Sequence, residues 1–167
     1  MLKFSILWAS LLLFFMGGCA TKHYTVSEPK LITIKTPKLK FSDMGYIRYA
    51  QDAIEVELFT AGVAVEKISI DQDVCVSAGC MSEEAFNHDY LYEGYPRDTM
   101  RRILQGKDIF EGVGKGESPT GLSQQSIKNE KMDILYRHSV KEVYFKDRMN
   151  GLMIKIGDVQ EDNTTTK

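Results

Sequence analysis

The sequence predicts an α+β fold in which a curved antiparallel sheet, or half-open β-barrel, of about seven to ten strands wraps around one main helix. Three observations predict this fold. Apolar and polar residues alternate over residues 46–58, which is the period of a half-buried strand. One clear helical pattern follows over residues 96–106. The dipeptide Asn150-Gly151 lies between two further alternating runs and predicts a β-hairpin.

The first strands are predicted in the N-terminal part of the domain. Residues 31–36 form a β-like run that ends at a proline. In residues 54–58 the apolar side chains share one face and the glutamates share the other. The alternation changes phase at residues 66–67, which indicates a β-bulge. Antiparallel strands with one solvated face are the simplest interpretation.

Two helical segments are predicted after these strands. Residues 82–92 begin with Ser82 as an N-cap and two glutamates, and indicate a short helix or an irregular lid. Pro96 suits the first turn of the main helix, and Gly106 marks its end. Its apolar face consists of Met100, Ile103 and Leu104.

The C-terminal part returns to strands after a glycine-rich loop at residues 111–121. The hairpin at Asn150-Gly151 closes the domain, with residues 152–156 as its second strand. Residues 158–167 are polar and are predicted to be a disordered tail. Residues 31–157 therefore form a single β-rich domain.

The N-terminus has the pattern of a secretory signal. Lys3 precedes a short apolar run, and Gly17-Gly18 leads directly to Cys19. This pattern resembles the lipobox of bacterial lipoproteins, which implies that residues 1–18 are removed and that Cys19 carries acyl chains. Residues 19–30 are then a lipidated tether. A plain transmembrane anchor and an ordinary signal peptide remain as alternatives.

The lipobox resemblance implies a bacterial envelope location. Ala20 follows the cysteine, where an aspartate would favour the inner membrane, so the outer membrane is expected, with the domain facing the periplasm. Removing residues 1–18, whose one charged residue is Lys3, changes the net charge from −2 to −3. Such a balance does not indicate a nucleic-acid partner.

Two further cysteines, Cys75 and Cys80, form an even pair outside the cytosol and predict a disulfide. A zinc site is the alternative, although it needs three or four ligands and only His88 lies nearby in the sequence. Two free thiols are the third possibility.

No catalytic, metal-binding or cofactor-binding motif is identified. Residues 112–116 are glycine-rich but lack the spacing and context of a phosphate-binding loop, so a mobile loop is the better interpretation. The three histidines lie far apart in the sequence, and no enzyme is predicted.

The tail contains a modification motif. Asn163 is followed by two threonines, and the acidic Glu161 precedes it by two positions, which resembles the extended sequon of bacterial N-glycosylation systems. A chance motif in a polar tail is the alternative.

Aromatic residues gather after the cysteine pair, where they predict an exposed apolar flap that contacts a lipid or a protein partner. The residues are Met81, Phe86, Tyr90, Leu91, Tyr92 and Tyr95. Burial of these side chains in the core is the alternative.

The order of elements resembles the LolB branch of the lipoprotein-localisation proteins. The residues that carry the resemblance are Asp98, Met100, Ile103, Leu104, Gly121, Leu122 and residues 152–156. The resemblance implies a half-open barrel with an apolar cavity lidded by helices, and the function of an outer-membrane acceptor of lipids or acylated proteins. The alternative is a non-enzymatic accessory or structural lipoprotein that binds an envelope protein.

Overall fold

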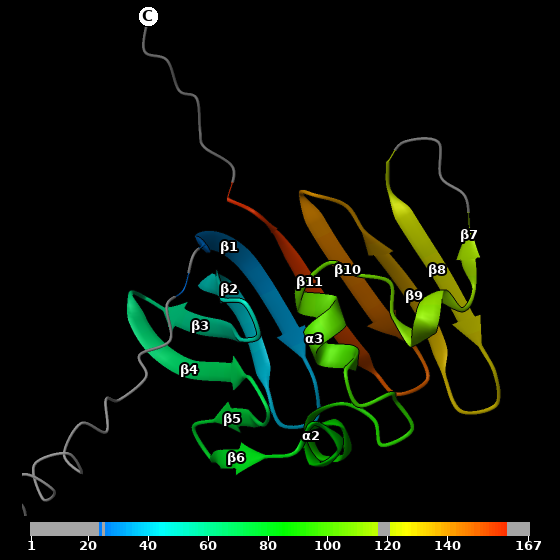
Figure 1. Cartoon of the computed structure of the whole chain (residues 1–167), viewed down its shortest axis with the longest axis horizontal. Helices are drawn as coiled ribbons and strands as arrows, with labels where there is room; N and C mark the ends of the chain where they lie inside the picture. Colours follow the sequence, from blue (N-terminus) through cyan, green and yellow to red (C-terminus); the bar gives the residue numbers. More distant parts are fainter. Residues whose placement is uncertain (1–23, 25, 117–120, 160–167) are drawn as a thin grey trace, which may run out of the picture.

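The computed structural model describes Tyr24 and residues 26–116 and 121–159. Within these residues, eleven antiparallel strands form one open sheet in the order β6-β5-β4-β3-β2-β1-β11-β10-β9-β8-β7 (Figure 1). The strands are β1 (Val26–Lys35), β2 (Lys40–Tyr49), β3 (Ile54–Thr60), β4 (Val63–Ile70), β5 (Val74–Val76), β6 (Gly79–Met81), β7 (Lys115–Gly116), β8 (Ser123–Lys128), β9 (Asp133–His138), β10 (Glu142–Asp147) and β11 (Leu152–Asp158). Between β6 and β7 lie the helices α2 (Glu83–Tyr90) and α3 (Thr99–Leu104) and the 3-10 turn η2 (Phe110–Gly112).

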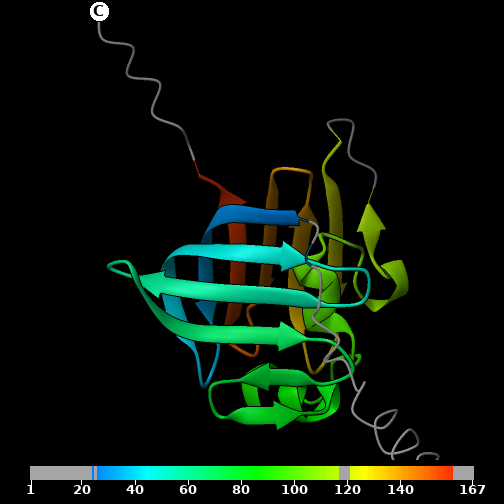
Figure 2. The same ribbon diagram turned by 60° about the vertical axis from the view of Figure 1, so that its left-hand side comes forward.

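The first and last strands are neighbours in the middle of the sheet. β1 to β6 form one meander and β7 to β11 form another, and β1 pairs with β11 to join them. In this pairing Ile32 lies opposite Ile156, and Ile34 lies opposite Ile154. Figure 2 shows β2 to β4 in front of the helices and the C-terminal strands behind them, so the sheet is curved and the helices lie on its concave side.

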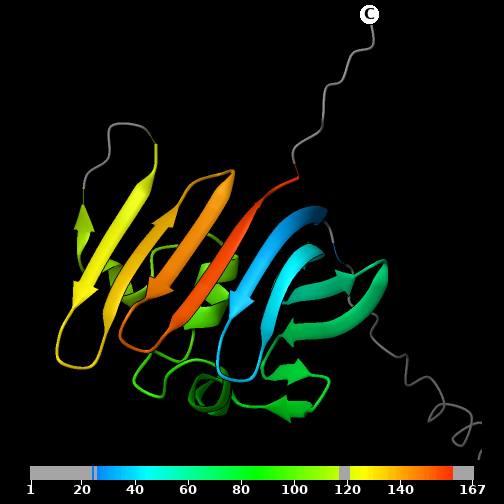
Figure 3. The ribbon, with the colours of Figure 1, turned by 180° about the vertical axis from the view of Figure 1, so that it is seen from behind.

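The two faces of the sheet differ in what covers them. We call the concave face, which the helices cover, the inner face, and the opposite one the outer face; Figure 3 shows the sheet from behind, with the helices beyond it. Side chains alternate between the faces, so Ile32 and Ile34 are buried on the inner face, whereas Leu31 and Lys35 are exposed on the outer face.

Side chains of the sheet itself supply most of the core. Large residues that are fully buried include Ile32, Ile34, Ile47, Ile54, Leu58, Ile68, Ile70, Ile134, Tyr136 and Phe145. Ile103 of α3 and Ile109 complete this set from the helical side. Each such side chain contributes about 1.5–3 kcal/mol through removal of apolar surface from water.

Both helices form where the sequence predicts helical structure. The Ser82 hydroxyl accepts a hydrogen bond from the Ala85 amide at 3.2 Å and caps α2. The predicted apolar face of α3, formed by Met100, Ile103 and Leu104, is buried. Gly106 follows the helix with a φ of 57°, a conformation that favours glycine at a helix end.

The predicted fold class, a sheet of about seven to ten strands wrapped around one main helix, is wrong. The six residues of α3 span about 9 Å, which is too short to fill the concave side of an eleven-stranded sheet. The sheet fills that space with its own side chains and is the dominant element. Strands β5, β6 and β7 are two or three residues long and show no readable alternation.

The turn of the last hairpin, the bulge and the two ends of the domain were also predicted. Asn150-Gly151 lies in the turn of the β10–β11 hairpin, as predicted. The register of β3 and β4 shifts between Leu58 and Phe59, opposite Glu66 and Ala64, one residue from the predicted bulge. β1 begins at Val26, so the predicted tether at residues 19–30 overlaps the strand. β11 ends at Asp158, and most of the predicted tail lies outside the described residues.

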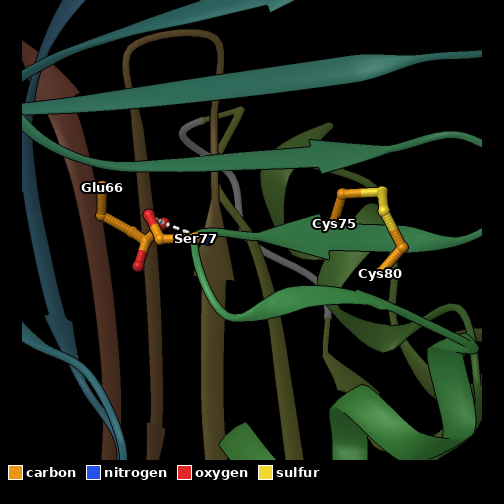
Figure 4. The surroundings of a disulfide bond; sticks show 4 residues. All are labelled: Glu66, Cys75, Ser77 and Cys80. Carbon is orange, nitrogen blue, oxygen red and sulfur yellow. Dashed lines mark hydrogen bonds between the residues drawn. A yellow bond between two sulfur atoms is a disulfide. The ribbon is translucent and has the colours of Figure 1, made fainter.

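Cys75 and Cys80 form a disulfide, which agrees with the prediction. They lie directly opposite each other on β5 and β6, as Figure 4 shows. Beside them, one Glu66 carboxylate oxygen accepts hydrogen bonds from the Ser77 amide at 2.9 Å and the Ser77 hydroxyl at 2.6 Å. The disulfide and this carboxylate fix the β5–β6 hairpin at the edge of the sheet.

Candidate functional site

The aromatic cluster is part of the core and does not form an exposed flap. Phe86, Tyr90, Leu91 and Tyr95 are buried, while Met81 and Tyr92 are partly buried against them. Phe86 and Tyr90 stack on each other at a centroid distance of 4.8 Å. The side chains that were predicted to contact a lipid or a protein partner therefore belong to the core around α2.

The inner side of the sheet has a small hollow among the described residues. The hollow beside the end of α3, lined by Tyr49, Leu104 and Ile156 among others, measures about 90 Å³. Ligand pockets usually measure about 300–1,000 Å³. This hollow is too small for a lipid tail.

The buried carboxylate of Asp147 holds the second meander together from inside. It accepts hydrogen bonds from the Tyr95 hydroxyl at 2.6 Å and from the Asn150 side-chain amide at 2.7 Å. The backbone amides of Asp133, Met149 and Asn150 also donate to it. Burial raises the pKa of Asp147, but the hydrogen bonds lower it by more than burial raises it. The pKa of Asp147 therefore lies below its usual value. Asp147 is a structural group that fixes the β10–β11 turn.

A second polar cluster surrounds Asp108, in the segment after α3. Its carboxylate accepts a hydrogen bond from the Lys115 ammonium group at 2.6 Å and from the Ser123 hydroxyl at 3.0 Å, and it lies 2.9 Å from His138 Nε2. The hydrogen bonds from Lys115 and His138 lower the pKa of Asp108 to about 2. Ser123 donates to the carboxylate, not to the histidine, so the cluster lacks the arrangement of an activated nucleophile.

The outer face carries exposed apolar side chains in its first meander. Leu31, Met44 and Tyr46 are 47%, 41% and 37% exposed. Leu31 lies opposite Met44 across β1 and β2, and the Tyr46 ring meets Phe59 of β3 edge-to-face at 5.7 Å. We call these four residues the apolar strip. A contiguous apolar group on a solvated face is typical of an interaction surface.

Hollows lie on both sides of the apolar strip. One of about 860 Å³ is lined by residues that include Leu31, Thr33, Ser42 and Lys155, which share the outer face. Another of about 450 Å³ is lined by residues that include Met44, Tyr46 and Phe59. Both of these hollows on the outer face are larger than the hollow beside the end of α3.

Charges on the outer face are matched around Arg48 of β2 and Lys67 of β4. Arg48 binds Glu55 and Glu57, both at 2.8 Å, and Lys67 binds Glu55 at 2.7 Å. The Tyr24 hydroxyl donates to Glu55 at 3.1 Å and so ties the start of the described chain to this face. Although burial raises the pKa of Glu55, the hydrogen bonds from Lys67 and Arg48 outweigh it and lower the pKa.

Four lysines on the neighbouring strands lack such partners. Lys35, Lys40, Lys146 and Lys155 share the outer face, as the register of β2, β1, β11 and β10 shows. None of the four forms an ion pair with another described residue. We call this group the lysine row.

Lys35→Glu is expected to raise the free energy of unfolding by about 0.5 kcal/mol, because a like-charge cross-strand pair with Lys40 becomes an opposite-charge pair. Urea denaturation at low and high salt measures the gain, which shrinks as salt screens the charges. Lys131→Glu, in an exposed turn, is the matched control and is expected to change little. A loss of stability in the Lys35 variant would contradict the expected repulsion.

Two predicted sites, Cys19 and Asn163, lie outside the described residues. No motif in the sequence marks the apolar strip or the lysine row. Alternation alone shows that these residues face outward, but only the strand register shows that they are neighbours.

Comparison with protein-family models, with curated proteins and with solved structures finds no match to this chain. Among the residues with described positions, no group of three or more histidine, cysteine or acidic side chains is placed to hold a metal ion. In the same part of the chain, no helix has the length and hydropathy needed to cross a bilayer. The outer face of β1, β2 and their neighbours, with the apolar strip and the lysine row, is the candidate site.

Proposed function

We propose that this protein is a lipid-anchored, non-enzymatic lipoprotein of the bacterial outer membrane that holds a protein partner on the outer face of its sheet. The observation that carries the proposal is the contrast between the two faces. The inner face is filled by the protein's own side chains, whereas the outer face presents the apolar strip between two hollows. A lipid acceptor would need the opposite arrangement.

The apolar strip suits a protein partner. Tyrosine, methionine and phenylalanine are enriched in protein interfaces, and charged residues commonly surround them. Arg48 lies over the Tyr46 ring at 5.7 Å and joins the strip to the matched charges of β3 and β4. The sheet edges are poor alternatives because β6 and β7 are only three and two residues long.

The proposed anchor keeps the outer face within reach of the membrane. Cys19 precedes Tyr24 by five residues, which span at most about 18 Å when fully extended. Tyr24 is bound to Glu55 on the outer face. A partner embedded in or attached to the same membrane is therefore accessible to this face.

Photo-crosslinking in the producing cells tests the proposal. With p-benzoylphenylalanine in place of Met44, we expect one discrete adduct with another envelope protein, and Tyr46→Glu is expected to reduce its yield at least tenfold. The same probe at Val140, which is 99% exposed in the β9–β10 turn, serves as the control and should give no such adduct.

The lipid-acceptor alternative makes the opposite prediction. If the purified mature chain bound a fluorescent fatty acid with saturation at micromolar concentration, and Met44 gave no protein adduct, the proposal would fail.

A further inference from the structure

We infer that the partner docks through an acidic segment, which lies along the lysine row and enters the hollow beside it. This inference rests on the proposed function and adds the chemistry of the partner. It is carried by the placement of the four lysines, by the charges around them, and by the shape of the surface.

The lysines lie in one band across four strands. Lys35 and Lys40 are direct cross-strand partners in β1 and β2. On the other side, Lys35 pairs with Met153 of β11, which pairs in turn with Lys146 of β10, and Lys155 is two residues further along β11. Like charges directly opposite each other repel.

The same outer face shows that this imbalance is local. Further along β2 and on β4, the cations Arg48 and Lys67 are neutralised by Glu55 and Glu57 of β3. Near the lysine row, Asp43 and Glu142 are exposed, Asp158 is bound to Lys30 and Asp133 is bound to Arg148, and none of these described acids forms an ion pair with the four lysines. An acidic segment would supply the missing counter-charges, and such complementarity commonly sets partner choice and the rate of association.

The surface around the row is hollowed, which favours a protruding segment. A hollow of about 550 Å³ is lined by residues that include Lys35, Lys40 and Ser42. No acidic residue among those described lines this hollow, whereas Asp43, Glu142 and Asp158 line the hollow of about 860 Å³ together with Lys155, so the acidic segment is expected in the first of the two. The hydroxyls of Ser42 and Thr33 are hydrogen-bonded to each other at 2.9 Å, and the one that accepts this bond can donate to a carboxylate.

The shape of the surface favours a protein segment over the bilayer itself. Lys35 and Lys40 line a hollow of about 550 Å³. A protruding segment can enter this hollow, whereas a planar bilayer cannot.

Photo-crosslinking from Ser42 in the full chain tests the inference. We expect an adduct whose cross-linked peptide, identified by mass spectrometry, carries clustered aspartates and glutamates. Reversal of two charges, Lys35→Glu with Lys40→Glu, should lower the yield at least tenfold. The matched pair Lys128→Glu with Lys131→Glu, also exposed lysines, should leave it within twofold. Replacing the partner's acidic residues by lysine should restore the adduct with the first pair.

The possible outcomes separate the two proposals. An adduct at Met44 that survives charge reversal, or a Ser42 peptide without acidic residues, would overturn the inference and leave the proposed function standing. Adducts with phospholipid, or with residues 160–167 of the chain itself, would also overturn it. Absence of adducts from both positions would reject both. If the double reversal does not fold, Lys155→Glu alone replaces it.

Discussion

Replacement of Asp147 by alanine is expected to lower the free energy of unfolding by about 3–5 kcal/mol, because a fully buried hydrogen-bond network loses its acceptor. The hydroxyl of Tyr95 and the backbone amides of Asp133, Met149 and Asn150 would then be left without this partner. Urea denaturation with circular dichroism measures the loss.

Two milder changes at the same network serve as controls. Tyr95→Phe removes one donor and keeps the ring, so a loss of about 1–2 kcal/mol is expected. Asp147→Asn keeps the shape but replaces one acceptor by a donor, and should fall between the two. If Asp147→Ala cost less than Tyr95→Phe, the carboxylate would not be the organising group.

The pH dependence follows from the same group. Because hydrogen bonds hold the folded-state pKa of Asp147 below its usual value, its ionised form stabilises the folded protein above the unfolded pKa of about 3.9. This contribution is lost as the pH falls through the folded-state pKa. Asp108, with its pKa of about 2, adds to the same acid-side loss. Asp147→Asn should therefore flatten the stability profile below pH 4.

Phe145→Ala is expected to cost about 3–5 kcal/mol, because a fully buried ring is removed and the surrounding structure collapses only in part. The ring of Phe145 meets Tyr95 at 6.0 Å and Tyr136 at 6.3 Å, both at steep angles. For a domain of this size, the melting temperature should fall by roughly 10–20 °C.

The matched control for this change is Phe59→Ala on the outer face. Phe59 is only partly buried and belongs to the apolar strip, so its loss should cost clearly less stability. Phe59→Ala should instead lower the yield of the photo-crosslinked adduct formed from p-benzoylphenylalanine at position 44. If Phe59→Ala proved as destabilising as Phe145→Ala, the outer face would be part of the core and not a docking surface.

The strands with strong alternation were predictable, and so was the burial of α3. Ile54, Val56 and Leu58 alternate with glutamates because one face of β3 lies in the apolar core and the other carries the ion pairs with Arg48 and Lys67. The chain of pairings was not predictable, because contacts such as Ile32 with Ile156 join segments from opposite ends of the sequence. The predicted balance between one main helix and seven to ten strands was wrong for the same reason. Only the pairing shows that eleven strands form one sheet, whose side chains supply most of the core.

The candidate site, too, depends on strand pairing that the sequence does not show. Aromatic residues at positions 86–95 attract attention because they are clustered in the sequence, yet the fold buries most of them. Leu31, Met44 and Phe59 are scattered over three strands and have no signal in common until the register brings them together. Burial of the aromatic residues at positions 86–95 in the core was the alternative to an exposed flap, and the structure shows most of them buried.

The pairing of β1 with β11 also sets the order in which the molecule can be completed. The first strand of the domain finds its second neighbour only when the last strand is available, so Ile32 and Ile34 stay without that cover during synthesis. Contacts between such distant segments form slowly because a long loop must close first. We therefore expect the middle of the sheet to be completed only after β11 has been synthesised.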